Sequence, residues 1–203
     1  MTSKLEISPH HDALLIVDVQ NDFVQPNGAL AVPEGPEVVP VINHISSTYT
    51  FRAVVASKDW HPLNHISFRN EDGTGGTWPP HCQQSTKGAK LHPDLRQEKL
   101  THIVHKATLA DADSYSVFGD DSGRTTGLTE MLKGMGVRRL FICGLAYDFC
   151  VYHTSLDAAR AGFEVFVLED AVRAVFPDKM PEKRTHLRQE GVQLVTSFDL
   201  SCP

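Results

Sequence analysis

The sequence has no long hydrophobic run. None of its apolar stretches approaches the roughly 18 uninterrupted apolar residues that a membrane-spanning helix needs. The amino terminus, MTSKLEISPHHD, also lacks the apolar segment of a secretory signal. We therefore expect a cytoplasmic protein that has no membrane partner.

An excess of positive charge is also absent. The chain has 19 Lys and Arg against 25 Asp and Glu, which gives a formal net charge of -6. Proteins that bind nucleic acid or anionic membranes mainly through charge present basic surfaces to them. This balance argues against both kinds of partner.

Cysteine is scarce and irregularly spaced. The four cysteines are Cys82, Cys143, Cys150 and Cys202, and no two of them form a CxxC pair. A secreted disulfide framework or a thiolate zinc knuckle would need a denser and more regular arrangement. The pattern therefore indicates a reducing compartment and at least one free thiol.

Repeats, low-complexity tracts and linker-like shifts in composition are absent as well. The length of 203 residues is enough for one substantial core and short for two independent ones. The content of 41% hydrophobic and 22% charged residues is typical of a globular protein. We predict a single domain over residues 1–203.

Short apolar runs alternate with segments that have helical character. Most of the runs lack strict alternation of polar and apolar residues, which is typical of strands buried on both faces. The expected strands are 13–17, 53–57, 102–104, 139–143, 164–168 and 192–196, and the expected helices are about 36–50, 124–135, 149–162 and 180–190. This order predicts an α/β fold of three layers (α/β/α), with a mostly parallel, doubly wound sheet of about six strands.

One segment, 60–98, does not follow this alternation. It is rich in His, Pro, Gly and Asn and has no clear hydrophobic period. An irregular segment of this length within a compact domain usually has a function. We therefore expect it to contribute to a binding or catalytic site.

Chemically capable residues follow four of the predicted strands. Asp18 follows the first, Asp59 the second and Lys106 the third, and Cys150 comes shortly after the fourth. Open α/β sheets bind ligands at the carboxyl ends of their strands, so these side chains should face one crevice. Each residue alone also has an ordinary structural explanation: a helix cap, a solvated lysine or a small buried hydrophobe. Their joint position favours catalysis.

Three of these residues can work together as a nucleophilic centre. A cysteine attacks as the thiolate, and Cys150 is expected near the first turn of a helix, where free N–H groups and the helix dipole lower its pKa. Asp18 can accept the thiol proton, and the positive charge of Lys106 favours the thiolate. The turn Gly144–Tyr147 before the cysteine can also offer backbone amides as an oxyanion hole.

A second group has the composition of a metal site. Asp59 and His61 are two residues apart at a strand end, so their side chains should point to the same side. Either His65 or His81 could complete a set of two histidines and one carboxylate, leaving positions open for water or substrate. Nitrogen and oxygen ligands without thiolate suit zinc, iron or manganese, so the identity of the ion stays open.

Five stretches in order along the chain resemble the nicotinamidases of the isochorismatase-like cysteine hydrolase family. They are LLIVDVQNDFVQPNGAL at 14–30, SKDWHPLNHISF at 57–68, WPPHC at 78–82, HKATLADADSYSVFGD at 105–120 and GLAYDFCVYHTSLDA at 144–158. Together they span most of the sequence. The resemblance implies the same α/β fold.

The resemblance also assigns roles to residues. It implies Asp18, Lys106 and Cys150 as the catalytic triad, and it selects His81 to join Asp59 and His61 as metal ligands, since His65 matches a ligand only in some relatives. It further implies a cis peptide bond between Leu145 and Ala146, an oxyanion hole formed by the amides of Ala146 and Cys150, and four residues around a flat pyridine ring: Phe23, Leu30, Trp78 and Tyr115. For these four residues, and for Leu30 especially, an ordinary core position is the alternative.

The activity implied by this resemblance is hydrolysis of nicotinamide to nicotinic acid and ammonia through a cysteine thioester, as part of NAD salvage. One divalent metal ion, zinc as the first candidate with iron or manganese open, would position the pyridine ring. The resemblance leaves open a homo-oligomer, and pyrazinamide as a further substrate.

Two alternatives differ in function. One is a relative of the same fold that acts on another small amide or on a vinyl ether, although the latter reaction does not need a thiol beside a metal site. The other is a non-catalytic metal- or nucleotide-binding module. The second alternative has little support, because no GxGxxG follows the first predicted strand and no GxxxxGK[ST] occurs.

Overall fold

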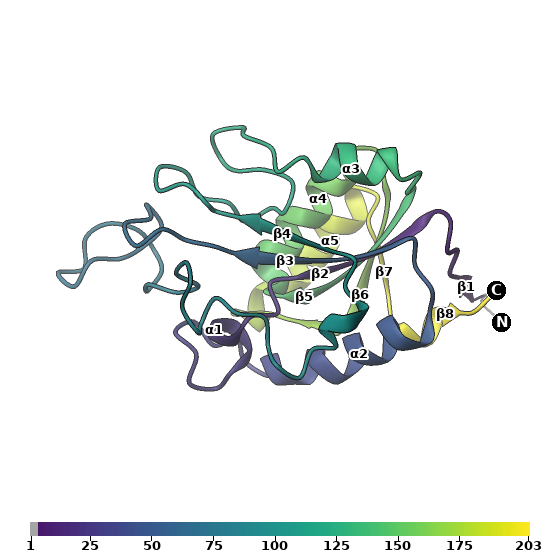
Figure 1. Ribbon diagram of the computed structural model, residues 1–203, viewed down its shortest axis with the longest axis horizontal. Helices are drawn as coiled ribbons and strands as arrows, with labels where there is room; N and C mark the ends of the chain where they lie inside the picture. Colours follow the sequence, from purple (N-terminus) through teal and green to yellow (C-terminus); the bar gives the residue numbers. More distant parts are fainter. Residues whose placement is uncertain (1–3) are drawn as a thin grey trace.

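A parallel β-sheet lies at the centre of the computed structural model, which describes residues 4–203 (Figure 1). The strands of this sheet are β2 (Asp12–Val17), β3 (Ala53–Asp59), β4 (His102–Lys106), β5 (Arg139–Leu145), β6 (Glu164–Arg173) and β7 (Gln193–Val195). Their order is β4-β3-β2-β5-β6-β7, and all neighbouring pairs are parallel. The predicted α/β fold with six parallel strands is therefore confirmed.

The central strands are buried because helices cover both faces of the sheet. Along β2, Ala13 and Leu15 contribute to one hydrophobic core, whereas Leu14 and Ile16 contribute to the other. The edge strand β4 has the different pattern expected at a sheet boundary, with partly buried and exposed residues alternating before the buried Lys106. The short apolar runs of the sequence thus correspond to strands, of which the central ones are covered on both sides.

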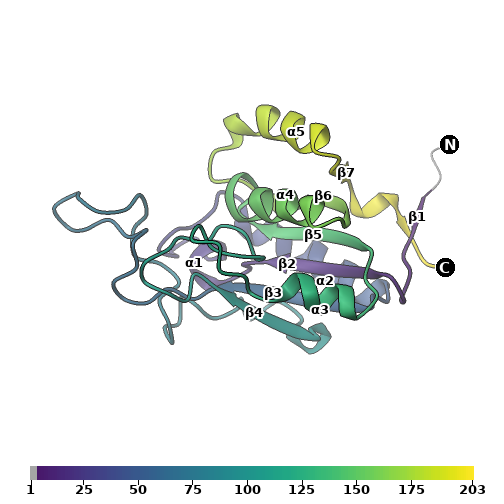
Figure 2. The ribbon, with the colours of Figure 1, turned by 90° about the horizontal axis from the view of Figure 1, so that it is seen from above.

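Two groups of helices complete the three layers. The helices are α1 (Asn21–Val24), α2 (Val38–Thr48), α3 (Leu128–Gly134), α4 (Tyr152–Arg160) and α5 (Met180–Gln189). Residues of α1 and α2 belong to the core on one face, and residues of α3, α4 and α5 belong to the core on the other. Figure 1 shows α2 below the sheet and α3 and α4 above it, and Figure 2 shows α4 and α5 stacked over β5 and β6. No helix within residues 4–203 is long and apolar enough to cross a membrane.

The structure refines the predicted elements in three places. The predicted helix at 149–162 begins as a π-helical turn, Tyr147–Val151, before α4. The four-residue helix α1 was not predicted. A two-stranded sheet of β1 (Leu5–Glu6) and β8 (Leu200–Ser201), which joins the two ends of the chain, was not predicted either.

The segment that follows β3 is irregular, as its composition predicts. Up to the short 3-10 helix Gln97–Lys99 it forms only turns and isolated bridges, such as the one between Phe68 and Trp78. In Figure 1 it forms long loops at the carboxyl end of the sheet. This is the end at which the candidate site residues lie.

Candidate active site

The side chains that follow the predicted strands meet at the carboxyl edge of the sheet. Potential ligand atoms of Asp18, Asp59 and Cys150 lie within 4.8 Å of one another, and all three residues are buried. They come from the ends of β2 and β3 and from the π-helical turn after β5. The three groups are thus brought together at this edge, and Asp59 and Cys150 line a common pocket.

Lys106, the last residue of β4, lies among these three groups. Its ammonium donates hydrogen bonds to Asp59 Oδ1, to the Ser114 carbonyl oxygen at 2.8 Å and to Cys150 Sγ at 3.5 Å. Burial lowers the pKa of Lys106, but the negative charges of Asp18 and Asp59 raise it by more. The pKa of Lys106 therefore lies well above its ordinary value. Lys106 is therefore a cation, and the same charge holds the pKa of Asp59 below its ordinary value against the effect of burial.

Asp18 is placed to act as a base. Its Oδ2 lies 3.1 Å from Lys106 Nζ without forming a hydrogen bond, and its Oδ1 accepts a hydrogen bond of 2.7 Å from the Ser57 hydroxyl. Burial raises the pKa of Asp18 to about 6, although Lys106 opposes this shift. The carboxylate is thus ionised at neutral pH and has one oxygen free for a proton.

The direction of the pKa shift predicted for Cys150 is wrong. A position near a helix start predicts a lowered pKa, but burial raises the pKa of the Cys150 thiol well above its ordinary value. Lys106 opposes this shift, whereas the charges of Asp18 and Asp59 add to it. The resting nucleophile is a neutral thiol, which makes a neighbouring base necessary.

The turn before Cys150 has an unusual backbone. Gly144 has φ of 108°, and the peptide bond between Leu145 and Ala146 is cis, as the resemblance implied. The amides of Phe149 and Val151, on either side of Cys150, both donate to the Ala146 carbonyl oxygen at 3.1 Å. The wide π-helical turn brings the Cys150 thiol to the floor of a pocket that Ala146 also lines.

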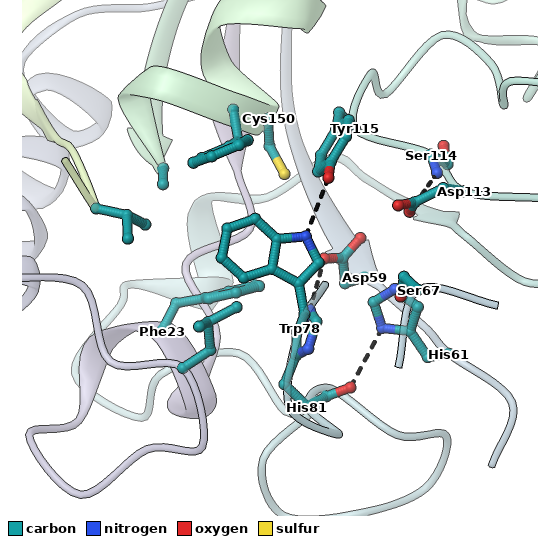
Figure 3. Close-up of a pocket in the computed structure, with 14 residues that line it drawn as sticks. Phe23, Asp59, His61, Ser67, Trp78, His81, Asp113, Ser114, Tyr115 and Cys150 are labelled. Carbon is teal, nitrogen blue, oxygen red and sulfur yellow. Dashed lines mark hydrogen bonds and ion pairs between the residues drawn. The ribbon is translucent and has the colours of Figure 1, made fainter. Parts of the chain in front are cut away.

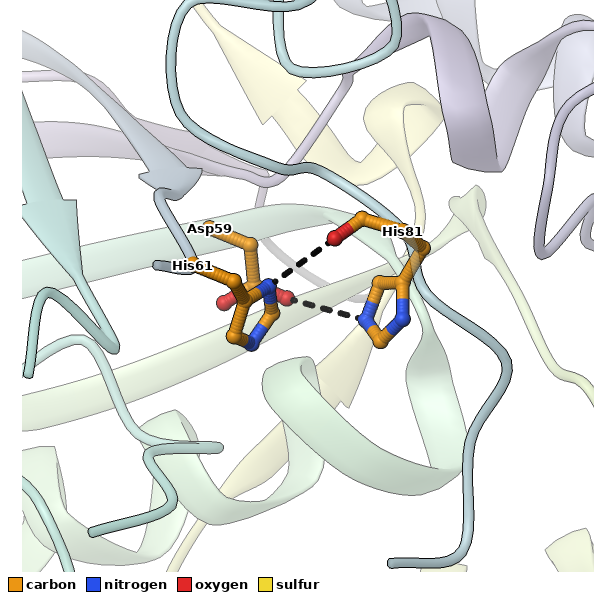
Figure 4. Close-up of side chains that lie close together, drawn as sticks. All are labelled: Asp59, His61 and His81. Carbon is orange, nitrogen blue, oxygen red and sulfur yellow. Dashed lines mark hydrogen bonds and ion pairs between the residues drawn. The ribbon is translucent and has the colours of Figure 1, made fainter. Parts of the chain in front are cut away.

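Asp59, His61 and His81 form a compact group with atoms suited to a metal ion (Figure 4). The Nδ1–H group of His61 donates to the His81 carbonyl oxygen at 3.2 Å, and that of His81 donates to the Pro79 carbonyl oxygen at 2.7 Å. Both Nε2 atoms therefore keep a lone pair, and Asp59 Oδ2 lies 3.9 Å from His81 Nε2. Burial also lowers the pKa of His61 to about 3, so this imidazole is neutral as a ligand must be. The donor set fits a divalent ion.

His65 lies beside this group, but both of its ring nitrogens are engaged. Its Nε2–H donates to the Ala112 carbonyl oxygen at 3.0 Å, and its Nδ1 is 2.8 Å from the Ser67 hydroxyl. A carbonyl oxygen can only accept, so Nδ1 holds the lone pair and uses it within the protein. This geometry agrees with leaving His65 out of the ligand set.

An aromatic pocket connects the thiol with the metal-binding group (Figure 3). Phe23, Leu30, Trp78 and Tyr115, the four residues expected around a flat ring, all line it. The Trp78 indole N–H donates to the Tyr115 hydroxyl at 3.0 Å, which fixes one wall. The pocket can therefore enclose a small planar molecule between the nucleophile and the histidines.

Sequence reasoning missed several residues at this site. Phe149, Val175, Asp113 and Ser114 also line the pocket. Ser57 binds Asp18, and the buried Gln20 binds the backbone of Asp59. Ser57 and Gln20 stand two residues from Asp59 and Asp18, and this spacing was the one signal that could have drawn attention to them.

A comparison of sequence patterns identifies the family. The pattern of the isochorismatase domain matches residues 12–199 of the chain. The chain belongs to the isochorismatase family. The match includes all the strands of the central sheet and every residue of the candidate site.

Three known proteins are similar to this chain over nearly their whole lengths. The nicotinamidase of Escherichia coli (strain K12) is 42% identical in an alignment that covers 92% of this chain and 95% of the relative. The crystal structure of PnC1 from L. infantum in complex with nicotinate matches with a TM-score of 0.95 and 42% identity, over 98% of this chain and 100% of that chain. The crystal structure of the pyrazinamidase of Pyrococcus horikoshii in complex with zinc matches with a TM-score of 0.80 and 40% identity, over 92% and 99% of the two chains.

Proposed function

We propose that this protein hydrolyses nicotinamide to nicotinate and ammonia, with Cys150 as the nucleophile. The observation that carries the proposal is the position of the Lys106 ammonium, which contacts both the Asp18 carboxylate and the Cys150 thiol at the floor of an aromatic pocket. The similarity to a nicotinamidase and to a nicotinate complex supports this choice of substrate.

The first half of the reaction transfers the acyl group to sulfur. Asp18 takes the thiol proton, and the Cys150 sulfur attacks the carboxamide carbon. The amide N–H groups of Ala146 and Cys150 stabilise the negative charge that forms on the carboxamide oxygen. Asp18 then returns the proton to the departing nitrogen, so that ammonia leaves and a thioester remains.

The second half regenerates the enzyme. Asp18 takes a proton from a water molecule, whose oxygen attacks the thioester carbon. The carbon–sulfur bond breaks, the proton returns to the Cys150 sulfur, and nicotinic acid is released. One residue thus serves as base and acid in both halves, which suits a carboxyl group with a pKa of about 6.

Asp59, His61 and His81 would hold the divalent ion, and the nitrogen and oxygen donor set suits zinc, with iron or manganese as alternatives. The zinc complex of a similar pyrazinamidase supports zinc as the first candidate. When bound, the ion would fix the pyridine nitrogen, directly or through water, and so orient the ring. Asp59 would also remain bonded to Lys106 and join this site to the catalytic one.

The pocket walls would exclude water and hold the ring flat. Phe23, Leu30 and Trp78 offer apolar surface, and Tyr115 fixes the Trp78 indole. Pyrazinamide, an aromatic molecule of the same shape, should fit the same pocket. Cytoplasmic location, a single domain, a homo-oligomer and a role in NAD salvage stay predictions.

The test is turnover of nicotinamide by metal-replete protein. We expect ammonia and nicotinate in equal amounts, and we expect Cys150→Ala to abolish both while the protein still folds and binds metal. Cys202→Ala is the matched control, because Cys202 is exposed and lies outside the pocket. Turnover that survives in Cys150→Ala would refute the role of the thiol. Inert nicotinamide with turnover of another amide or of a vinyl ether would refute the substrate.

A further inference from the structure

The backbone pairing between β2 and β3 stops short of the catalytic residues. It ends at the pair Ile16 and Ala56. The pairing of β2 with β5 continues to Val17, and that of β3 with β4 continues to Asp59. The strands β2 and β3 therefore have no backbone pairing with each other at Asp18 and Asp59, the two carboxylates that follow or end them.

The Ser57 side chain bridges the first part of this gap. Its hydroxyl accepts a hydrogen bond of 3.1 Å from the Asp18 N–H and donates one of 2.7 Å to Asp18 Oδ1. Asp18 has φ of 48°, a left-handed conformation that is uncommon outside glycine, and the two bonds hold it there. Ser57 thus fixes both the backbone and the carboxylate of Asp18.

The Gln20 side chain bridges the second part. Its Oε1 accepts the Asp59 N–H at 2.8 Å, and its Nε2 donates to the carbonyl oxygens of Asp59 at 2.8 Å and of Ala89 at 3.0 Å. Ser57 and Gln20 are both fully buried. The amide side chain therefore takes the place of a neighbouring strand, since it satisfies both the donor and the acceptor of the Asp59 backbone.

We propose that Gln20 and Ser57 are positioning residues. Ser57 holds Asp18 and Gln20 holds Asp59, so that the two carboxylates keep the separation across the Lys106 ammonium that the reaction requires. We call these two side chains the side-chain ladder. The proposal rests on the proposed function for the catalytic role of Asp18.

The residue types match this role. The Gln20 position needs a donor and an acceptor in one side chain, which an amide provides and a carboxylate does not. The Ser57 position needs a hydroxyl, which can accept from an N–H and donate to a carboxylate at once. None of the three hydrogen bonds of Lys106 goes to Asp18, whereas the Ser57 hydroxyl donates directly to Asp18 Oδ1.

The experiment compares Ser57→Ala with Ser57→Thr and with Ser46→Ala. Ser46 is a buried serine of α2 whose hydroxyl donates to the Asn43 carbonyl oxygen in the same helix. Ser46→Ala therefore shows how much kcat changes when a buried hydroxyl away from the site is removed. We expect Ser57→Ala to lower kcat for nicotinamide by roughly 10- to 100-fold with KM little changed, because one hydrogen bond to a charged group is lost. Ser57→Thr should restore most of kcat, and Ser46→Ala should leave it unchanged.

A second measurement does not depend on the substrate. Iodoacetamide alkylates the thiolate, so its rate at Cys150, followed by mass spectrometry of the peptide, reports how well Asp18 takes the thiol proton. We expect Ser57→Ala to slow this rate in the wild-type background and to leave it unchanged in Asp18→Asn. If nicotinamide is not the substrate, wild type will show no turnover while this comparison still decides the role of Ser57.

Two results would overturn the proposal. One is a Cys150 alkylation rate in Ser57→Ala equal to that of wild type, and the other is an equal slowing in the Asp18→Asn background. Gln20→Glu tests the other half of the ladder independently, so failure of one variant to fold leaves the other decisive. It should slow alkylation at Cys150 at least about tenfold, and a wild-type rate in the folded variant would remove Gln20 from the ladder.

Discussion

The ammonium of Lys106 has three protons and four neighbours. Its hydrogen bonds go to Asp59, to the Ser114 carbonyl oxygen and to Cys150. Asp18 forms an ion pair with the ammonium but accepts no hydrogen bond from it. A direct bond would stabilise the Asp18 carboxylate further and make it a weaker base. The arrangement thus leaves Asp18 ionised at neutral pH and able to take a proton.

The pKa of Asp18 gives a prediction for the pH dependence of the reaction. Only the ionised carboxylate can accept the thiol proton, and its fraction falls as pH falls through about 6. We expect kcat/KM to decrease about tenfold per pH unit below that value. A pH–rate profile measures this, with tryptophan fluorescence at each pH as the control for folding. A flat profile down to about pH 5 would contradict the role of Asp18 as base.

The histidines allow a matched test of the metal site. We expect His81→Ala to lower the metal content of the purified protein, because it removes a free Nε2 lone pair. His65→Ala should keep the metal, because both nitrogens of His65 already bond within the protein. Metal analysis by mass spectrometry after dialysis measures both. Equal loss of metal in the two variants would place His65 among the ligands.

Chelation addresses the same site in wild type. We expect removal of the ion to reduce nicotinamide turnover and its return to restore it, because the ring would lose its orienting contact. Alkylation at Cys150 is the control, since the thiol and Asp18 remain in place. Full turnover by metal-free protein would contradict the positioning role of the ion.

At the scale of elements, the strands were predictable and several connections were not. A run such as LLIV is buried on both faces, so its composition alone marks a strand. The two-residue strands β1 and β8 and the four-residue helix α1 are too short to show a period. The π-helical turn at Cys150 depends on tertiary contacts, which no local pattern reports.

The close approach of β2 and β5 gives a prediction at this scale. A Cβ atom on Gly144 would lie 2.1 Å from the Val17 carbonyl oxygen, and its φ of 108° is unfavourable for any other residue. We expect Gly144→Ala to lower the free energy of unfolding by at least about 3 kcal/mol, because the central strands must separate. Urea unfolding measures this change.

Gly134 in α3 is the control for that substitution. No atom outside its own helix lies within 4 Å of a Cβ built there, and its φ is not positive. We expect Gly134→Ala to leave stability unchanged or to raise it by up to about 1 kcal/mol. Equal losses in the two variants would show that the contact with Val17 is not the cause.

At the scale of the whole molecule, the site could be predicted in its reactive groups but not in its supports. Asp18, Asp59 and Cys150 are chemically capable residues, and their common position after predicted strands distinguished them from ordinary structural residues. Ser57 and Gln20 are ordinary polar residues in a sequence, and only their partners across the sheet give them a role. The prediction of a low pKa for Cys150 is wrong for the same reason: burial raises this pKa, and burial depends on the assembled fold.

The two hydrophobic cores predict how the chain unfolds. Alternate residues of the same strands, such as Leu14 and Leu15, belong to different cores, so neither core can persist without the shared sheet. We expect one cooperative transition, as the single-domain prediction requires. Calorimetry measures this through equal calorimetric and van't Hoff enthalpies. Two resolved transitions in the monomeric protein would contradict it.

The strand order also has a consequence for synthesis on the ribosome. The central strand β2 leaves the ribosome early, but its neighbour β5 ends at Leu145, late in the chain. Until then one edge of β2, with its apolar LLIV sequence, has no partner and is open to pairing with other chains. Because Asp18 and Cys150 lie on the two sides of this late junction, a nascent chain interrupted before β5 lacks both the second neighbour of β2 and the nucleophile. Synthesis from β5 through Cys150 is therefore the step at which β2 gains its second neighbour and the nucleophile joins Asp18.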